Sequence, residues 1–118
     1  MAEFNEKQKK DASMIYNEIT ATVDVLAMKK VRLSLQKIGV PGISVFQVRG
    51  YGERKNFFRR GWMQQSNCVR VFAPEDQTDR IVNAIMDAAH SGMEGDGIIA
   101  VNPLSRFYNI RDKKRIDQ

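Results

Sequence analysis

Three glycines, Gly92, Gly95 and Gly97, lie within six residues, and the apolar run 98–101 follows directly. Gly92 is expected to end a preceding helix in the left-handed conformation, which glycine adopts at little cost. Gly95 and Gly97 flank Asp96 and leave backbone N–H groups uncovered, so this loop could bring amide donors close to an anion. Most glycine-rich loops are only turns, in which an aspartate like Asp96 stabilises the backbone. Phosphate binding and a plain turn are therefore both open.

Apolar periodicity predicts the elements around this loop. Alternation over residues 15–23 predicts a half-buried strand, and Asp24 can cap the turn that follows. Helical spacing of apolar residues over 28–38 predicts an amphipathic helix that ends at Gly39. The remaining expected elements are a strand at 43–51, a loop at 52–66, a strand at 67–73, a helix after Pro74, a strand at 98–101 and a short strand within 104–110.

The order strand-helix-strand, strand-helix-strand predicts a ferredoxin-like α+β fold (βαββαβ), with two helices on one face of an antiparallel four-stranded sheet. The predicted domain covers residues 14–112, between a mobile N-terminal arm at 1–13 and a charged tail at 113–118. The second face of the sheet, where residues such as Thr20 and Thr22 lie, has no helix to cover it and needs another partner.

Composition narrows the partners and the compartment. The 118 residues suit one domain, and no apolar run is long enough to insert into a membrane. The mixed charges at the N-terminus are unlike a signal peptide, and the single Cys68 cannot form an intrachain disulfide, which indicates the cytoplasm. The net charge of +5 suits nucleic acid, an acidic protein or a phosphorylated small molecule.

An enzyme is not predicted, because His90 is the only histidine and no Cys, His and carboxylate cluster has metal-ligand spacing. Cys68 lies in a predicted strand and is expected in the core. Segment 54–62 interleaves cations with aromatic residues, as single-strand binders do, but strand 98–101 has no aromatic residue on which a base could stack. A basic ferredoxin-like module that binds RNA or protein is therefore the alternative function, with nucleic acid the less favoured partner.

Two further glycine corners, Gly39–Gly42 and Arg49–Gly52, accompany the segment Gly92-x-x-Gly95-Asp96-Gly97-x-Ile99-x-Val101-x-Pro103. Together they resemble the PII signal-protein family over residues 16–112, with a shortened middle loop. The resemblance implies a homotrimer whose sheets cover one another's open faces. It also implies an adenine nucleotide in the cleft between neighbouring subunits and a flexible loop that contacts a protein target.

The resemblance implies a role for each matching residue. One group borders the base, a second forms the root of the effector loop, and a third holds the phosphates through backbone amides and a guanidinium. The nucleotide-binding residues implied are Gly42, Ile43, Ser44, Arg49, Gly50, Tyr51, Gly52, Phe72, Gly95, Asp96, Gly97 and Arg111. The effector loop would present Arg54, Lys55, Phe57, Phe58, Arg59, Arg60 and Trp62. No catalytic residue and no metal ligand is implied.

The chain departs from the family pattern at three positions. Ile98 stands where the family has a lysine, and Asn109 replaces the first arginine of a terminal Arg-x-Arg pair. Arg54 replaces the glutamine that helps to hold magnesium and 2-oxoglutarate. These changes favour ADP or AMP over ATP as the ligand. The short loop resembles the PII-like proteins associated with carboxysome or bicarbonate-uptake genes, which implies bicarbonate as a co-effector and a carboxysome component or bicarbonate transporter as the target.

Overall fold

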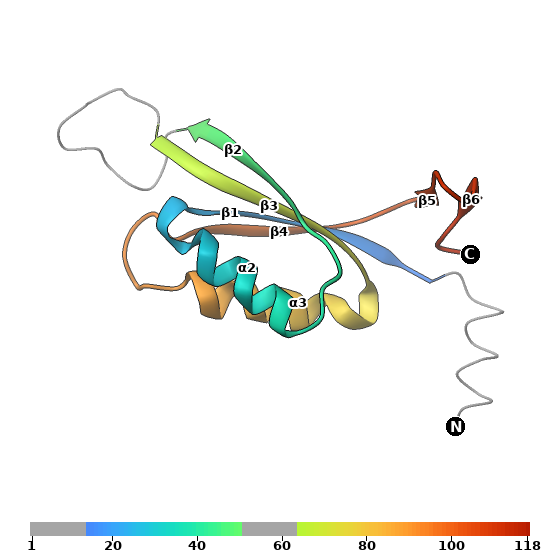
Figure 1. Ribbon diagram of the computed structural model, residues 1–118, viewed down its shortest axis with the longest axis horizontal. Coiled ribbons are helices and arrows are strands. Elements are labelled where there is room, and N and C mark those ends of the chain that lie inside the picture. The colour runs from blue at the N-terminus through green and yellow to red at the C-terminus, as the bar shows by residue number, and fades with distance from the viewer. Residues whose placement is uncertain (1–13, 51–63) are drawn as a thin grey trace.

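The computed structural model describes residues 14–50 and 64–118 (Figure 1). Its elements are β1 (Tyr16–Asp24), the 3-10 helix η1 (Val25–Ala27), α2 (Met28–Lys37), β2 (Ser44–Gly50), β3 (Gln64–Pro74), α3 (Glu75–Ala89), β4 (Gly97–Pro103), β5 (Tyr108–Asn109) and β6 (Lys114–Arg115). The predicted N-terminal arm, together with Tyr51, Gly52 and the predicted effector-loop residues from Arg54 to Trp62, lies outside the described residues.

The main sheet has the strand order β2-β3-β1-β4, and every neighbouring pair is antiparallel. Both helices cover the same face of this sheet, below it in Figure 1. The predicted ferredoxin-like βαββαβ fold is therefore confirmed. The opposite face has no covering element among the described residues, and β2 and β4 are the two edge strands of the sheet.

The core follows the alternation read from the sequence. Every second residue of β1 is buried, and Ile19 and Ala21 lie opposite Val71 and Val69 of β3. The helices add fully buried side chains to the same layer, such as Leu35. Each such residue contributes about 1.5–3 kcal/mol through burial. The polar Asn17 is also buried, and its amide donates to Thr78 Oγ1 at 2.9 Å, which ties the first turn of α3 to β1.

The residues expected to begin or end helices do so at η1 and α2 but not at α3. Asp24 caps η1 by accepting from the Leu26 amide, and Gly39 follows α2 with φ of +88°. In contrast, α3 ends at Ala89 and His90 is already extended, so the expectation that Gly92 ends this helix was wrong. Gly92 has φ of +83° but lies in the following loop, because the chain leaves the helix before reaching it.

Strand β3 and the C-terminus also differ from expectation. β3 begins at Gln64, inside the predicted loop 52–66. The short strand expected within 104–110 is the two-residue β5, which pairs with β6 rather than with the main sheet. β6 lies in the segment expected to be a charged tail. The C-terminal hairpin, residues 104–118, projects from one end of the sheet (Figure 1).

This hairpin is fixed by aromatic packing and by an ion pair. The Phe107 ring lies 5.0 Å from the ring of Tyr16 and 5.3 Å from that of Phe72, centroid to centroid. Asp117 is only 5% exposed and accepts from Arg115 Nε at 2.9 Å and from the Phe107 amide at 3.2 Å. The hydrogen bond from Arg115 is the main cause that lowers the pKa of Asp117 from 3.8 to about 2. The aromatic packing attaches the hairpin to the domain, and the contacts of Asp117 hold the hairpin itself together.

We expect the hairpin to lose its internal order in acid. The folded state holds the pKa of Asp117 below its unfolded value. The stability that the ionised carboxylate contributes is therefore fully present above pH 3.8 and is lost as the pH falls toward 2. NMR titration of the Phe107 amide and ring signals should show this transition. Asp117→Asn should show the acid-state signals already at neutral pH, and a variant whose Phe107 signals match those of the wild type would contradict the assignment.

Candidate functional site

At one end of the sheet, four residues predicted to border a nucleotide base line one pocket. The pocket has a volume of about 400 Å³ and lies between the start of β2 and the open face of β3. Its lining residues are Pro41, Gly42, Ile43, Ser44, Arg70 and Phe72. Apolar walls with few polar groups are typical of sites that bind small molecules. We call this surface the Phe72 pocket.

Arg70 is the residue of this pocket that sequence reasoning missed. Its guanidinium carbon lies 5.6 Å from the Phe46 ring centroid and 5.7 Å from that of Phe72, within the range of cation–π attraction. Its Nε is buried and has no hydrogen-bond partner among the residues that the structure describes. A buried donor without an acceptor is costly, so Arg70 stands out among the residues of this pocket.

The glycine loop, residues 91–97, leads into the start of β4. The Asp96 carboxylate accepts from the amides of Ser91 at 2.8 Å and of Gly92 at 2.9 Å, and from the Ser91 hydroxyl. The Ser91 hydroxyl is the largest cause that lowers the pKa of Asp96. Of the two hypotheses for Asp96, the structure supports its role in stabilising the turn. These contacts hold the turn together, and Gly95 within it has φ of +88°.

Gly97 is required by the sheet itself. A Cβ atom on Gly97 would lie 1.8 Å from the carbonyl oxygen of Thr22, the β1 residue that precedes its register partner Val23. Its φ of +115° is also outside the range that other residues adopt readily. Whatever the loop binds, this glycine is needed so that β4 can begin against β1.

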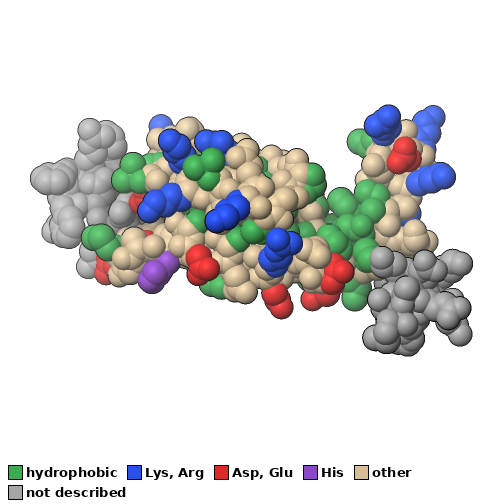
Figure 2. All heavy atoms as spheres, turned by 60° about the horizontal axis from the view of Figure 1, so that its bottom comes forward, with side chains coloured by type: hydrophobic (Ala, Val, Ile, Leu, Met, Phe, Trp, Pro, Cys, Tyr) green, Lys and Arg blue, Asp and Glu red, His purple; other side chains and the backbone are tan. Residues whose placement is uncertain are grey.

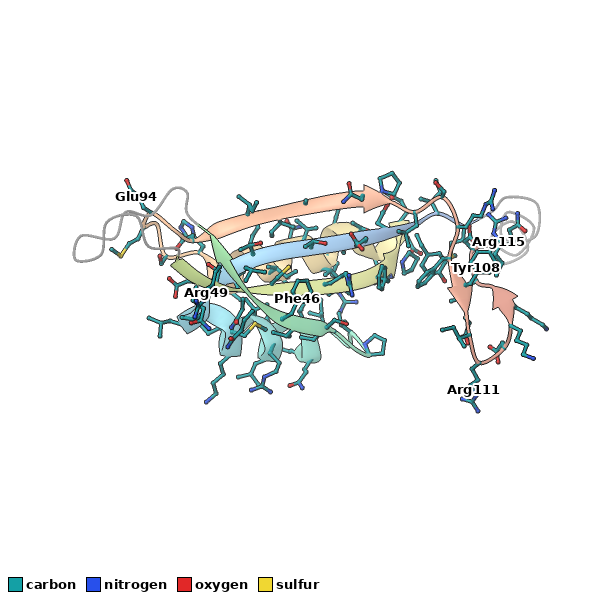
Figure 3. The ribbon with its side chains drawn as sticks, turned by 90° about the horizontal axis from the view of Figure 1, so that it is seen from above. Phe46, Arg49, Glu94, Tyr108, Arg111 and Arg115 are labelled. Atoms are coloured by element: carbon teal, nitrogen blue, oxygen red, sulfur yellow. The ribbon has the colours of Figure 1, made fainter. Side chains whose placement is uncertain are left out.

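The predicted site residues that the structure describes fall into two groups at opposite ends of the folded molecule. Figure 3 shows Arg49 and Glu94 at one end and Tyr108 and Arg111 at the other. β4 separates the glycine loop from the hairpin, and its seven residues extend about 20 Å. Arg111 therefore does not meet the amides of Gly95–Gly97 in the same chain. One end holds Arg49, Gly50, Gly95, Asp96 and Gly97, and the other holds Gly42, Ile43, Ser44, Phe72 and Arg111.

The two ends of one chain cannot form a nucleotide site together. A single chain carries both halves of the predicted nucleotide site but keeps them apart. The halves can meet only if the base end of one copy faces the glycine-loop end of another. Such a head-to-tail contact is heterologous, and repeated contacts of this kind close into a ring when the rotation allows it.

Comparison with known proteins agrees with this geometry. Residues 16–114 match the family described as nitrogen regulatory protein P-II. The chain belongs to the P-II family. This P-II chain is 31% identical over 100 residues to nitrogen regulatory protein GlnK of Escherichia coli (strain K12), an alignment that covers 79% of the chain and 89% of the relative. It is 28% identical over 102 residues to nitrogen regulatory protein P-II of Nostoc punctiforme, which covers 80% and 90%.

A solved P-II structure has the same architecture. The crystal structure of Arabidopsis thaliana PII bound to citrate matches with a TM-score of 0.72 at 27% identity and covers 85% of this chain and 84% of that one. The resemblance read from the glycine motifs is thereby confirmed, and identities near 30% fit a divergent member of the family. Members of the P-II family are regulatory proteins, as the names of these relatives state.

The two positions at which the resemblance leads us to expect a cation, Ile98 and Asn109, lie in different environments. Ile98 follows the glycine loop as an exposed side chain at the start of β4. Asn109 lies in the hairpin, where its side-chain oxygen accepts from the Asp112 amide at 3.1 Å. Asn109 therefore serves the hairpin turn, whereas Ile98 presents an exposed apolar side chain.

No group of three or more His, Cys, Asp or Glu side chains in ranges 14–50 and 64–118 is placed to hold a metal ion. Over the same ranges, no helix is both long and apolar enough to cross a membrane.

Proposed function

We propose that this P-II chain is a cytoplasmic, non-enzymatic regulator that binds adenine nucleotides between the subunits of a homotrimer. One observation carries the proposal: the predicted contact residues are sorted to opposite ends of one chain. The base end has the apolar Phe72 pocket, and the other end has the glycine loop, whose turn is closed by Asp96. A nucleotide has the same two parts, an apolar base and an anionic phosphate group, and can span two copies.

The base end supplies recognition of a ring. Phe72 is partly exposed in the monomer and offers one face for stacking, while Ser44 and the guanidinium of Arg70 add polar groups at the rim. The guanidinium lies near the Phe72 ring, 5.7 Å from its centroid, so the charge of Arg70 lies close to the face proposed to stack on the base.

The phosphate end supplies backbone amides but few cations. Arg111 of a neighbouring copy would approach phosphates held at Gly95–Gly97, whereas Ile98 and Asn109 provide no charge. Each charge-assisted contact contributes roughly 1.5–3 kcal/mol. With two cations absent, the third phosphate of ATP adds little binding free energy. We therefore propose that ADP or AMP binds at least as tightly as ATP.

The signal would pass through the short loop that follows Arg49 and Gly50. A ligand orders this loop only if it binds the two loop states with different affinity. We propose bicarbonate as co-effector and a carboxysome component or bicarbonate transporter as target, because the loop and the reduced phosphate site resemble that subfamily. Bicarbonate should then tighten nucleotide binding, since linkage between two ligands is reciprocal.

Isothermal titration calorimetry with AMP, ADP and ATP, with and without magnesium and bicarbonate, tests the proposal. We expect ADP or AMP to bind at least as tightly as ATP. Tight, magnesium-dependent ATP binding that is enhanced by 2-oxoglutarate, with no binding of ADP or AMP, would replace the proposal with an ordinary nitrogen-responsive P-II protein.

Arg111→Ala should weaken all three nucleotides about tenfold or more, because it removes one charge-assisted phosphate contact. Arg106→Ala is the matched control, since Arg106 is an exposed cation of the same C-terminal segment that has no assigned role in the site. Equal affinities for the two variants in calorimetry would remove Arg111 from the site.

A further inference from the structure

The outer surface of α2 carries positive charge and no carboxylate. Of its ten residues, four are Lys or Arg and none is Asp or Glu. The four cations, all of them exposed, are Lys29, Lys30, Arg32 and Lys37. Figure 2 shows the helix-covered face of the molecule, with Lys and Arg side chains spread over its upper part and Asp and Glu side chains mainly along its lower border. Because α2 has no carboxylate of its own, its cations add up to a local positive potential.

Two leucines project from this basic surface. Leu33 is 47% exposed and lies one helical turn after Lys29 and one turn before Lys37. Leu26 is 87% exposed and belongs to η1, which leads directly into α2. Spacings of three and four residues place Leu26, Lys30, Leu33 and Lys37 in one row on the side of the helix away from the core. Exposed leucines among lysines are the features through which a helix lies on an anionic membrane surface.

The two leucines lie outside the groove between α3 and β4 and outside the cavity at the end of α2. The groove has a volume of about 550 Å³ and the cavity one of about 270 Å³, and both are lined by other residues. A protein segment that docks on a helical surface normally enters a groove, whereas a lipid layer takes up side chains that project from a convex surface. We propose that the η1–α2 face, residues 25–37, docks on an anionic bilayer, with Leu26 and Leu33 entering the headgroup layer and the lysines contacting headgroup phosphates.

The neighbouring helix determines which side of the molecule faces the lipid. α3 packs beside α2, where Ser34 Oγ donates to the Ala84 carbonyl oxygen at 3.4 Å. The exposed carboxylates of α3 are those of Glu75, Asp76, Asp79 and Asp87. An anionic bilayer repels them, so the molecule is expected to rest on its α2 side with α3 turned toward water. The contact uses neither half of the proposed nucleotide site, so its test is independent of nucleotide binding.

Flotation of the full chain with lipid vesicles, without nucleotide, tests the contact. Vesicles that contain about 30% phosphatidylserine in phosphatidylcholine should carry the wild type at about 0.1 M salt, and about 0.5 M salt should release it, because salt screens the attraction. Vesicles of phosphatidylcholine alone should leave the protein unbound. A wild type that stays unbound with both compositions, or that binds both equally, would overturn the proposal.

A triple variant, Lys29→Gln with Lys30→Gln and Lys37→Gln, removes three cations of the proposed contact. Binding to the anionic vesicles should weaken about 100-fold, since each cation at such a surface contributes about fivefold. All three side chains are exposed, so circular dichroism should show an unchanged fold.

The matched control removes the same charge from exposed positions of the C-terminal hairpin, through Arg106→Gln, Lys113→Gln and Lys114→Gln. It should weaken vesicle binding less than about fivefold, because these cations lie outside the proposed contact. Equal losses in the two triple variants would overturn docking through α2, since net charge alone would then hold the protein on the lipid.

Leu26→Gln tests the apolar part of the contact. It should weaken vesicle binding about tenfold, because a leucine no longer enters the headgroup layer. Ile110→Gln is its control and should leave binding unchanged, since Ile110 is 93% exposed but lies on the hairpin. Equal binding by these two variants would contradict the insertion of Leu26.

A single-stranded oligonucleotide is the competing anionic ligand for the same cations. The proposal predicts that any binding of the oligonucleotide is unaffected by the α2 triple variant. Oligonucleotide binding that this variant abolishes, from a wild type that does not float with anionic vesicles, would assign the face to nucleic acid and overturn the proposal.

Discussion

Gly97→Ala is expected to destabilise the protein by about 2–5 kcal/mol, because two costs add. The new Cβ would lie 1.8 Å from the Thr22 carbonyl oxygen, so β4 must move away from β1 or the backbone must deform. The φ of +115° adds strain of its own for any residue with a side chain. Denaturant unfolding at a fixed protein concentration measures the difference, since assembly makes apparent stability depend on concentration.

Gly42→Ala is the control for this experiment. Gly42 has no atom within 4 Å of a built Cβ and no positive φ, so its replacement should change stability by no more than about 0.5 kcal/mol. A Gly97→Ala variant that unfolds at the same denaturant concentration as Gly42→Ala would show that the start of β4 is not packed against β1 as described.

The double variant Ile98→Lys, Asn109→Arg should shift the preference for ATP over ADP by roughly 100-fold. It restores two cations next to the proposed phosphate site, each contributing roughly 1.5–3 kcal/mol where it contacts an additional phosphate. Asn109→Arg also removes the bond to the Asp112 amide, which lowers hairpin stability but affects ADP and ATP alike. Calorimetry with both nucleotides gives the ratio of their dissociation constants.

The neutral double variant Ile98→Gln, Asn109→Gln separates charge from shape in this test. It adds polar side chains of related length without cations and should leave the ratio of ATP to ADP affinity near that of the wild type. The proposed explanation of nucleotide preference would be contradicted if both double variants shifted the ratio equally, or if neither shifted it.

Local patterns were sufficient for the fold because its core depends on alternation and helical spacing. The buried alternation of β1 and the stripe of α2 that includes Val31 and Leu35 can be read from the sequence directly. The hairpin could not be read in this way, because strands of two residues carry no period. The true helix end at Ala89 was missed since the following loop is capped by Asp96, five residues beyond Ser91.

The candidate site was predictable as a set of residues but not as an arrangement. Motif resemblance identified Gly42–Ser44 and Phe72, and the structure places them in one pocket. Arg70 was missed because a charged residue that alternates with apolar ones in a strand is normally solvated, whereas here it lies between two aromatic rings. The separation of Arg111 from the glycine loop depends on the direction of β4 in the sheet, which no local pattern contains.

The central claim, that one nucleotide site is built from two copies, is tested most directly by complementation. Phe72→Asp should abolish binding at the base end, and Gly95→Asp should do so at the phosphate end by adding a negative charge next to the proposed phosphates. The φ of +88° at Gly95 adds backbone strain, so assembly of this variant is measured alongside. Each variant alone should bind no ADP. After the two are mixed, dissociated and reassembled, about one junction in four should pair two intact halves and regain wild-type affinity in calorimetry. A mixture that binds no ADP, from variants that each still form trimers, would contradict the shared site.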